Sequence, residues 1–542
     1  MARTNTLGNF LTDVADAIRT KKGSQELIAA ADFDTEIENI SGISMPAMEN
    51  DVMFYDYDGT VVYSYTKDEF LALEAMPAVP THNGLTAQGW NWTLEELQDY
   101  VEDYGVGQAG ATYTPTDGKT KIDIEINSEE LDLYLCLGVN GTVTIEWGDN
   151  STSQDITGTN STLYTQHIYP SPGKYTIILQ PGENSSVTLP GQTGNGGCLF
   201  TITNTWNNAN FARRRHIVTG LIIGNDTVIG TCGAGYPAMK YIILPQTLNV
   251  ANMSYVTFSP IALRVLIYPR TYTTVFSAQY GNEASGLMSV IYPPNLSSGP
   301  NGRMLSNNYC ARRFLPTGTR IMQYTCSGAK ALSLVVIPKT ITDIRDSVFE
   351  NCSNLTKIVM GCDNLTKIPY GFVQNCTSLT EIIIPSSITK FDTNCFYGCT
   401  NLSKVDCSGL SVVPTLTSLN NFSNVPTDCK IMVPDDLYES WVVASNWSSL
   451  SSKIYPYDSN GNEMTKATIT LATDSSTDAV INAPTSVLTV VTHTYTLPSY
   501  SDLTTTSLEE NLQFSDGTNT YSLGDTITVT GDATFTLIDT SA

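Results

Sequence analysis

The chain has 542 residues, which is too long for one hydrophobic core and predicts three to five domains. It carries 28 basic and 53 acidic residues, a formal net charge of −25, and this balance argues against a nucleic-acid partner because phosphate would repel the protein. No apolar run of 18 residues occurs, so no membrane insertion is expected.

Residues 1–44 are predicted to form two short helices, the first with its apolar residues on one stripe. Helices of this size bury little surface alone, so we expect this segment to dock onto another protein or onto its own copies, the alternative being a disordered tag. No secretory signal is visible in residues 1–22. The expected docking or oligomerisation residues are Leu7, Phe10, Leu11, Val14 and Ile18.

The string Leu7–Arg19, followed by Ala30–Asp34, resembles the opening of tail-associated proteins from phages of Gram-positive gut bacteria. The resemblance implies that the N-terminal segment docks onto other virion proteins.

Residues 45–107 are predicted to form a small α+β module, a hairpin plus two helices. Val52–Val62 consists of two apolar runs around Asp58-Gly59, which is a strong hairpin signal. The same string is similar to the opening of haloacid dehalogenase-like phosphatases, which implies a nucleophile at Asp56 and a general acid at Asp58 beside Mg²⁺. No parallel βαβ series and no matching Ser/Thr or Lys motif follows, so the hairpin is favoured.

Two capping boxes predict the helices of this module. Thr66–Glu69 begins a helix that is expected to run through Met76, and Thr93–Glu96 begins one that is expected to run through Tyr104.

Residues 108–182 are predicted to be strands, because apolar and polar residues alternate along them. Trp147–Asn150 and His167–Ile177 are similar to the sequence pattern of PKD-type β-sandwiches, from which the chain departs at Glu146 and Asn150. The resemblance implies an Ig-like spacer or binding module.

Two sets of residues in these modules allow a functional and a structural interpretation. Trp90 and Trp92 could stack on sugar rings, but a small module needs large core side chains, so we expect them in the core. Asp149 and His167 could perform acid–base chemistry, but no nucleophile accompanies them, so a structural role is expected.

Residues 183–220 are predicted to be a linker and the N-terminal cap of a repeat array. Their basic cluster, Arg213–His216, is expected to pair with nearby carboxylates.

Residues 221–455 contain an internal repeat. Apolar runs closed by proline recur, and the first five of these prolines, from Pro245 to Pro338, are separated by 24, 24, 23 and 22 residues. A unit of this size cannot bury its apolar face alone, so the units must stack into a solenoid, and their length is that of leucine-rich repeats. The in-phase Cys352, Cys376 and Cys399 are expected to stack as buried small apolar residues.

The units between Lys330 and Lys404 resemble the BspA-like class of leucine-rich repeats, through the recurring Phe-x-x-Cys-x-x-Leu. This implies a solenoid used for binding. Tyrosine is enriched in the earlier units, where we expect exposed side chains to contact a host cell-surface protein or glycan. The proposed contacts are Tyr268, Tyr272, Tyr280, Tyr292 and Tyr309.

The end of the array is expected to be a cap formed by a short helix after Asp435-Asp436, with Trp447 and Ile454. Residues 456–466 are predicted to be a linker, and residues 467–542 a small all-β domain. The predicted fold class is therefore multidomain and mainly β with short helices: a leucine-rich-repeat solenoid flanked by an Ig/PKD-like β-sandwich and a C-terminal all-β domain, each folding independently.

These patterns favour a non-enzymatic receptor-binding protein of a bacteriophage virion, in a tail fibre or baseplate. We expect it to be made in the host cytoplasm without a signal peptide, released by lysis, and homo-oligomeric, with a trimer as one option. The alternative is a bacterial cell-surface BspA-like adhesin. No catalytic residue, cofactor or metal site is predicted, because only four histidines occur and they are scattered.

Overall fold

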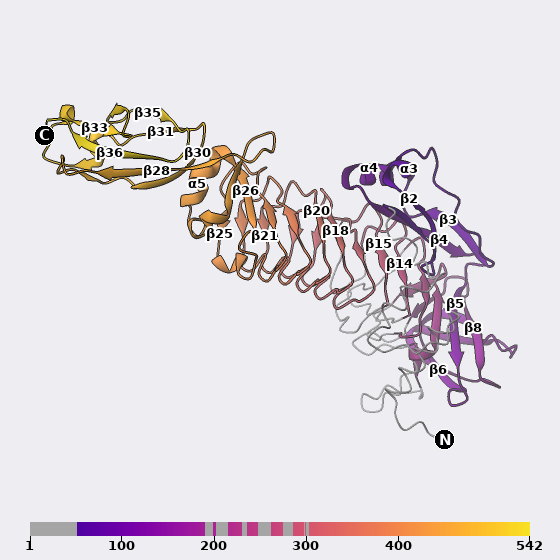
Figure 1. The fold of residues 1–542 in the computed structure, drawn as a ribbon. Coiled ribbons are helices and arrows are strands. Elements are labelled where there is room, and N and C mark those ends of the chain that lie inside the picture. Colours follow the sequence, from indigo (N-terminus) through magenta and orange to yellow (C-terminus); the bar gives the residue numbers. More distant parts are fainter. Residues whose placement is uncertain are drawn as a thin grey trace, which may run out of the picture.

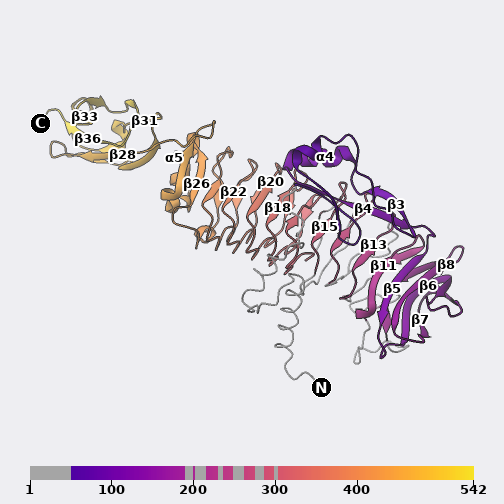
Figure 2. The ribbon, with the colours of Figure 1, turned by 45° about the vertical axis from the view of Figure 1, so that its right-hand side comes forward.

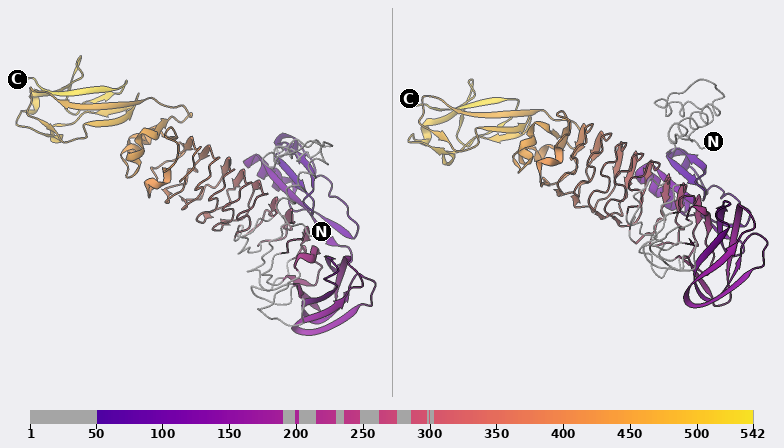
Figure 3. Two further views of the ribbon diagram at one scale, coloured as in Figure 1. Left: turned by 60° about the horizontal axis from the view of Figure 1, so that its bottom comes forward. Right: turned by 90° about the horizontal axis from the view of Figure 1, so that it is seen from below.

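The structure is a computed structural model, and it describes residues 51–189, 199–201, 215–229, 236–247, 262–274, 286–297, 299 and 303–541. These residues are mainly β with few helices, and they form an elongated molecule (Figure 1). Residues 51–115 and residues 120–181 lie at one end, stacked rungs form the middle, and residues 466–539 form the other end, as Figure 3 shows from two further sides.

The α+β module has a four-stranded sheet in the order β2-β1-β4-β3. Strands β1 and β2 pair antiparallel around Asp58-Gly59, so the hairpin prediction is confirmed. Both predicted capping boxes are present, at Thr66 with Glu69 and at Thr93 with Glu96. The elements are β1 (Val52–Tyr55), β2 (Val61–Tyr65), α3 (Lys67–Leu71), β3 (Leu85–Trp90), α4 (Leu94–Tyr104) and β4 (Gly107–Pro115).

Helix α4 ends at Tyr104 as predicted, where Gly105 adopts a φ of 76°. Helix α3 ends at Leu71, five residues before the expected Met76. The amide of Gln98, on α4, donates to the carbonyls of Phe70, Leu71 and Leu73 at 3.4, 3.2 and 3.0 Å. These bonds satisfy carbonyl groups at the end of α3, so the helix can stop there.

Trp90 and Trp92 are buried, which confirms their expected place in the core. Trp90 Nε1 donates to the carbonyl of Pro77 at 2.7 Å, and the Trp90 ring packs edge-on against Phe54 with centroids 4.8 Å apart.

The strands from Thr120 onward form a sheet that continues into the repeat array, whereas β4, which lies within the predicted β-sandwich range 108–182, pairs with β1 and β3 of the α+β module instead. The order of the continuous sheet is β12-β9-β6-β8-β5-β11-β13, with β7 and β10 also paired to β6. Because β11 pairs antiparallel with β5 and parallel with β13, one sheet joins the two regions. The strands are β5 (Thr120–Ile126), β6 (Asp132–Glu146), β7 (Gln154–Ile168), β8 (Gly173–Pro181), β9 (Ser186–Leu189), β10 (Phe200–Thr201), β11 (Val218–Ile222), β12 (Thr227–Ile229) and β13 (Tyr241–Ile243), with a 3₁₀ turn, η2 (Arg215–Ile217).

The sheet and the array are not separated by a break in the core, although the sequence predicts a linker and cap at residues 183–220 between them. One hydrophobic core runs without a break from Ile122, on β5, through the rungs to Trp447. The sheet therefore acts as the cap that covers the first rung.

Residues 220–457 form the solenoid, with one main strand per rung. Neighbouring main strands pair in parallel in the described rungs, for example Leu334 with Lys357 and Glu381 with Lys404. After β13, the main strands are β14 (Val265–Ile267), β15 (Ser289–Ile291), β16 (Arg313–Phe314), β18 (Leu334–Ile337), β20 (Lys357–Met360), β22 (Glu381–Ile383), β24 (Lys404–Asp406), β26 (Lys430–Pro434) and β27 (Ile454–Tyr457).

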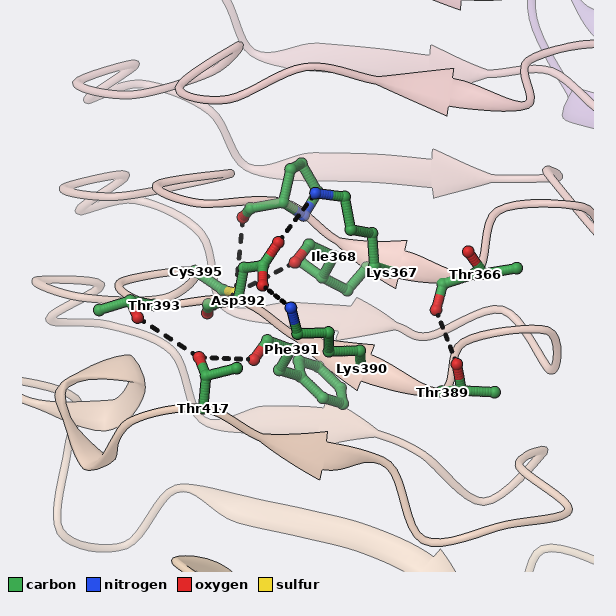
Figure 4. Close-up of polar contacts among 11 residues, drawn as sticks. Thr366, Lys367, Ile368, Thr389, Lys390, Phe391, Asp392, Thr393, Cys395 and Thr417 are labelled. Carbon is green, nitrogen blue, oxygen red and sulfur yellow. Dashed lines mark hydrogen bonds and ion pairs between the residues drawn. The ribbon is translucent and has the colours of Figure 1, made fainter.

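A second row of two-residue strands runs along another side of the rungs. It contains β17 (Arg320–Ile321), β19 (Asp343–Ile344), β21 (Lys367–Ile368), β23 (Lys390–Phe391) and β25 (Thr415–Leu416). Figure 4 shows how polar side chains join neighbouring rungs in this row. The Asp392 carboxylate lies 2.7 Å from Lys390 Nζ and 2.9 Å from Lys367 Nζ, which is one rung away. Thr389 Oγ1 donates to the carbonyl of Thr366 at 3.2 Å.

The in-phase cysteines are buried thiols inside the rungs, as predicted. The Sγ of Cys352, Cys376 and Cys399 donates to the carbonyls of Cys326, Phe349 and Val373 in the preceding rungs, at 3.0, 3.1 and 3.1 Å. Burial raises the pKa of the Cys376 and Cys399 thiols, which keeps them protonated.

The end of the array is the predicted cap, with Trp441 and Trp447 buried against each other at a centroid distance of 5.3 Å. Strand β27 pairs with β26 through Tyr457, so the array reaches two residues into the predicted linker. The cap elements are η4 (Asp435–Leu437), α5 (Tyr438–Val443) and η5 (Trp447–Lys453), and the last full rung carries the 3₁₀ turn η3 (Leu419–Phe422).

The distal part is all β, as predicted, and has a core of its own that includes Ile469, Phe514 and Leu537. Its main sheet has the order β30-β28-β36-β33-β34. The elements are β28 (Lys466–Thr473), β29 (Val480–Ile481), β30 (Ser486–Val490), β31 (Thr494–Thr496), η6 (Tyr500–Asp502), β32 (Leu503–Thr504), η7 (Glu509–Asn511), β33 (Leu512–Ser515), β34 (Thr520–Ser522), β35 (Thr526–Thr528) and β36 (Ala533–Asp539).

Candidate recognition surface

The predicted contact tyrosines do not form an exposed set. Tyr268, Tyr272 and Tyr292 are only 0, 3 and 1% exposed, so their expected exposure is wrong. Tyr268 and Tyr292 stack with centroids 6.0 Å apart inside the array, because the early rungs use large rings where later rungs use Phe and Leu. Tyr309 is 59% exposed, and Tyr280 lies outside the described residues.

The predicted docking residues of the N-terminal segment, Leu7, Phe10, Leu11, Val14 and Ile18, all lie outside the described residues. Their role stays a prediction.

The α+β module is docked on the main sheet of the early rungs, which the sequence did not indicate. Figure 2 shows β4 and α4 lying across these strands. Here we call residues 51–115 the docked module. Its apolar residues share one core with Ile243, Leu315 and Val336 of the array, and a second cluster joins Met53 and Tyr55 to Val265, Ile267 and Ile291.

Buried polar groups fix the position of the docked module. Asn91 Nδ2 donates to the carbonyls of Tyr268 and Tyr292 at 3.1 and 3.4 Å, while Asn91 Oδ1 accepts from the backbone of Gly110 at 2.8 Å. Gln108 Nε2 donates to the carbonyl of Val290 at 2.9 Å. These groups lie in an apolar contact, where an unpaired amide is costly, so they select one docked position.

Charge also differs between the docked module and the array. Residues 51–107 carry 11 acidic residues and one basic residue, whereas residues 221–430 carry 15 basic and 10 acidic residues. All residues outside 221–430 together include 13 basic and 43 acidic residues. Two ion pairs cross the contact: Arg270 to Glu96 at 2.7 Å and Lys339 to Asp103 at 2.8 Å.

The later rungs leave the same sheet uncovered. Alternation along each strand buries Ile382, Val405 and Ile431 and turns their neighbours outward. Ile383 is 63% exposed there and pairs in register with Asp406 on the next strand. The outward side chains that we call the open face are Lys357, Glu381, Ile383, Lys404 and Asp406.

The open face combines an exposed apolar side chain, Ile383, with charged side chains at the surface. Glu381 lies in register with Lys404, and Lys404 with Lys430. Lys404 Nζ lies 3.4 Å from Asp406 on its own strand. Such pairs at a surface contribute little stability, so these charges can be rearranged by a ligand at low cost.

The distal edge of the open face contains an aromatic and cationic cluster. Lys430 Nζ lies 4.7 Å and Lys466 Nζ 3.8 Å from the ring centroid of Tyr455. Lys430 Nζ also contacts Glu463 at 2.6 Å, and this hydrogen bond lowers the pKa of the Glu463 carboxyl. The cluster joins the array to the distal domain, so we assign it a structural role.

The acidic and histidine residues with catalytic alternatives are held by structural contacts. Asp56 is buried beyond the hairpin strand, where its carboxylate accepts from Tyr113 Oη at 2.9 Å and lies 2.7 Å from His82 Nε2. His167 lies 2.8 Å from Asp149 and stacks on Trp147 at 4.5 Å. Neither pair has a free nucleophile beside it among these contacts.

Two further findings concern only the described part of the chain. No three His, Cys, Asp or Glu side chains come together there in a way that could hold a metal ion. No helix there is long and apolar enough to cross a membrane.

Comparison with protein families matches residues 319–431 to the BspA type leucine rich repeat region, in six copies. The resemblance of these rungs to BspA-like repeats is therefore confirmed. No match is found among the curated proteins.

Among solved structures, the chain is similar to a leucine rich cell surface protein of Faecalibacterium prausnitzii, with 18% identity, a TM-score of 0.27, and coverage of 40% of this chain and 60% of that one. It is also similar to the pneumococcal vaccine antigen PcpA, with 13% identity, a TM-score of 0.26, and coverage of 42% of this chain and 64% of that one. A third similar structure is a leucine-rich repeat protein of Bacteroides ovatus, with 18% identity, a TM-score of 0.24, and coverage of 46% of this chain and 80% of that one.

The aligned part spans less than two thirds of the first two of these chains. At such TM-scores these likenesses add nothing to the argument from the repeats. None of the comparisons supports the phage-tail resemblance of the N-terminal residues or the PKD-like resemblance of residues 147–177.

Proposed function

We propose that the protein is a non-enzymatic adhesion protein that displays its repeat array at a bacterial cell surface and binds a protein or glycan there. The open face carries this proposal. It is the stretch of main sheet between the docked module and the distal domain, with Ile383 63% exposed among Lys357, Glu381 and Lys404. The BspA-type match of residues 319–431 supports it.

The docked module supplies a second argument, because it occupies the equivalent sheet on the early rungs. In that contact, the acidic and partly apolar surface of the docked module covers outward-facing strand residues of the array, such as Val336. The open face offers the same strand geometry and a higher share of lysine than the chain as a whole. A partner with an acidic and apolar surface would therefore fit it.

The other parts have supporting roles in this proposal. Residues 120–181, with their PKD-like pattern, cap the array, and residues 467–542 extend it away from the docked module. No cofactor is required. Residues 1–44 attach the protein to other copies or to a surface.

The adhesion test measures binding of the labelled full chain to bacterial and epithelial cells. Ile383→Glu is expected to reduce binding at least tenfold, because it places a charge at the centre of the open face. Val412→Glu is the matched control, since Val412 is also exposed but lies off the main strands. Equal binding by both variants and the unmodified chain would overturn the assignment of the open face.

The tail-protein alternative rests on the sequence resemblance of Leu7–Arg19. It places the protein on a virion, whereas our proposal places it on a bacterial cell. Antibodies to the distal domain are expected to label intact bacterial cells under our proposal. Co-sedimentation of the protein with purified virions, without labelling of cells, would instead support the tail-protein alternative.

A further inference from the structure

A hollow of about 830 Å³ lies at one corner of the last rungs, away from the open face. It lies where the chain returns from the row of short strands to the main sheet, between η3 and β26. We call it the corner hollow, and its lining includes Asn375, Tyr397, Gly398, Asn424, Thr427 and Asp428.

The corner hollow exists because a regular column of side chains is interrupted. A column of residues with positive φ runs along this corner: Asn307 at 53°, Gly328 at 73°, Asn351 at 62°, Asn375 at 59°, Gly398 at 72° and Asn424 at 62°. Asn375 Nδ2 donates to Asn351 Oδ1 at 2.9 Å, so the two amides form a ladder. Gly398 has no side chain, and the ladder stops there.

The rung length increases at the same place. From Asn351 to Asn375 the step is 24 residues, and from Asn375 to Gly398 it is 23, but from Gly398 to Asn424 it is 26. The additional residues, around η3, separate Asn424 from Asn375. The missing side chain and the longer unit together leave the space open.

The polar groups that line this space differ in how they are bound. On its N-terminal side, Asn375 and Thr377 are tied to the preceding rung, through the amide ladder and through Thr377 Oγ1, which donates to the carbonyl of Ser353 at 3.3 Å. On the other side, Thr400, Asn424, Thr427 and Asp428 are exposed to solvent, where a ligand can reach them. The hollow therefore presents both donors and acceptors to a ligand.

The lining chemistry restricts the class of ligand. No Lys, Arg or His lines the corner hollow, so a phosphate, sulfate or sialylated ligand would meet only the negative charge of Asp428. Asn and Thr side chains both donate and accept, and a carboxylate accepts strongly from hydroxyl groups. The ring of Tyr397 supplies a flat apolar face. The hollow is wide open to solvent, so it suits a ligand that lays one face on it while the other stays hydrated, as a surface glycan does.

We propose that the corner hollow binds a neutral glycan, with hydroxyl groups bonded to Asn424, Thr427 and Asp428 and one sugar face against Tyr397. The proposal deepens the adhesion function and rests on it, since it names one class of surface ligand and its place. It adds a second contact to the open face, at another side of the same rungs.

Gly398→Asn is the decisive variant. Asparagine tolerates a positive φ, as Asn351 and Asn375 show in the same column, and its side chain would extend the ladder into the hollow. A Cβ at residue 398 overlaps Asn375 Oδ1, which is the end of a flexible side chain and can rotate away. Gly328→Asn is the matched control, because its Cβ overlaps Asn307 Oδ1 in the same manner and it does not line the hollow.

The experiment applies the full chain to an array of neutral hexose and N-acetylhexosamine oligosaccharides, with sialylated and sulfated counterparts, and measures the best neutral oligosaccharide by calorimetry. The unmodified chain and Gly328→Asn are expected to bind equally. Gly398→Asn and Tyr397→Ala are expected to lose at least tenfold in affinity, and Asp428→Asn severalfold. Asp428 is exposed, so its variant tests the site even if Gly398→Asn fails to fold.

Three outcomes would overturn the proposal: no neutral oligosaccharide bound by the unmodified chain, a preference for sialylated or sulfated ligands, or unchanged binding by folded Gly398→Asn and by Asp428→Asn. Cell adhesion separates this failure from failure of the adhesion function. If Ile383→Glu abolishes adhesion but no form of the chain binds a glycan, the proposed role of the open face stands and the proposed glycan site in the corner hollow is wrong.

Discussion

Asparagine and glycine recur at one corner of the array because the chain turns there with a positive φ. Most L-residues avoid this conformation, whereas Gly has no Cβ and Asn is tolerated. Asn351 and Asn375 add a hydrogen bond between their amides, so they stabilise the stack as well as the turn. At the scale of the residue, the repeat is thus set by backbone geometry as much as by the apolar positions.

Replacing Asn351 separates these two contributions. Asn351→Ala should lower the free energy of unfolding by about 1–2 kcal/mol through the left-handed backbone, in addition to the lost amide bond. Asn351→Gly also loses the bond and adds about 0.5–1 kcal/mol of unfolded-chain entropy, but it avoids the strained backbone and should be the more stable of the two variants. Urea midpoints give both values. Equal midpoints would mean that the positive φ of 62° carries no cost for alanine at this corner.

Asp392 makes the stability of the array depend on pH. Burial acts to raise the pKa of this carboxyl, but hydrogen bonds from Lys390 and Lys367 outweigh burial, and the pKa is lowered. A carboxyl with a lowered pKa in the folded state stabilises the protein above its unfolded pKa, about 3.9, and this stabilisation is lost as the pH falls through the folded pKa.

We therefore expect Asp392→Asn to be less stable than the unmodified chain at pH 7, with the difference shrinking below about pH 4. Urea midpoints measured from pH 7 down to about pH 2 check this. Asp363→Asn is the control, because Asp363 is exposed and has no ion pair among the described residues. A difference that stays constant across this range would contradict the assignment.

Rungs are the elements that the sequence predicts best, and their ends are the least well predicted. A unit of about 24 residues must stack, because its apolar face has no other cover. Phe396 and Leu379 are each buried completely inside such rungs. Helix α3, in contrast, stops early because Gln98 of another helix satisfies its carbonyls, and no local signal contains that information.

Truncating a rung side chain should damage the array locally. Phe396→Ala or Leu379→Ala is expected to cost about 2–5 kcal/mol. Because each rung contacts mainly its neighbours, the loss of amide protection in hydrogen exchange should be confined to adjacent rungs. The docked module serves as the internal control. Loss of protection throughout residues 51–115 in either variant would show that the two ends of the array are coupled.

The whole molecule consists of one long core with a docked module at one end and a separate core at the other. The docked module covers the early rungs through apolar contacts, buried amides and two ion pairs. The distal domain has its own apolar cluster. The uncovered sheet between them is a consequence of this arrangement, since the docked module is too short to cover every rung.

Asn91 is the residue with which to test the docking. Asn91→Ala removes two hydrogen bonds to the array and leaves the Gly110 amide without its acceptor, which should cost about 1–3 kcal/mol. Hydrogen exchange is expected to accelerate in residues 51–115 and in β14 and β15, and to remain unchanged in the distal domain. Asn401→Ala, at an exposed turn, is the control. Unchanged exchange in the docked module would mean that apolar contacts alone hold it.

The sequence by itself determined the local elements: the repeat and its period, both capping boxes, the Asp58-Gly59 hairpin, the stacked cysteines and the all-β distal part. Each follows from residues close together in the chain, through periodicity, turn geometry or capping. Only the tertiary structure decided that residues 51–115 lie on the array, that Tyr268, Tyr272 and Tyr292 face inward, and that the capping sheet and the array share one core. These depend on contacts between residues more than two hundred positions apart, as from Asp103 to Lys339, and no local pattern specifies which surfaces meet.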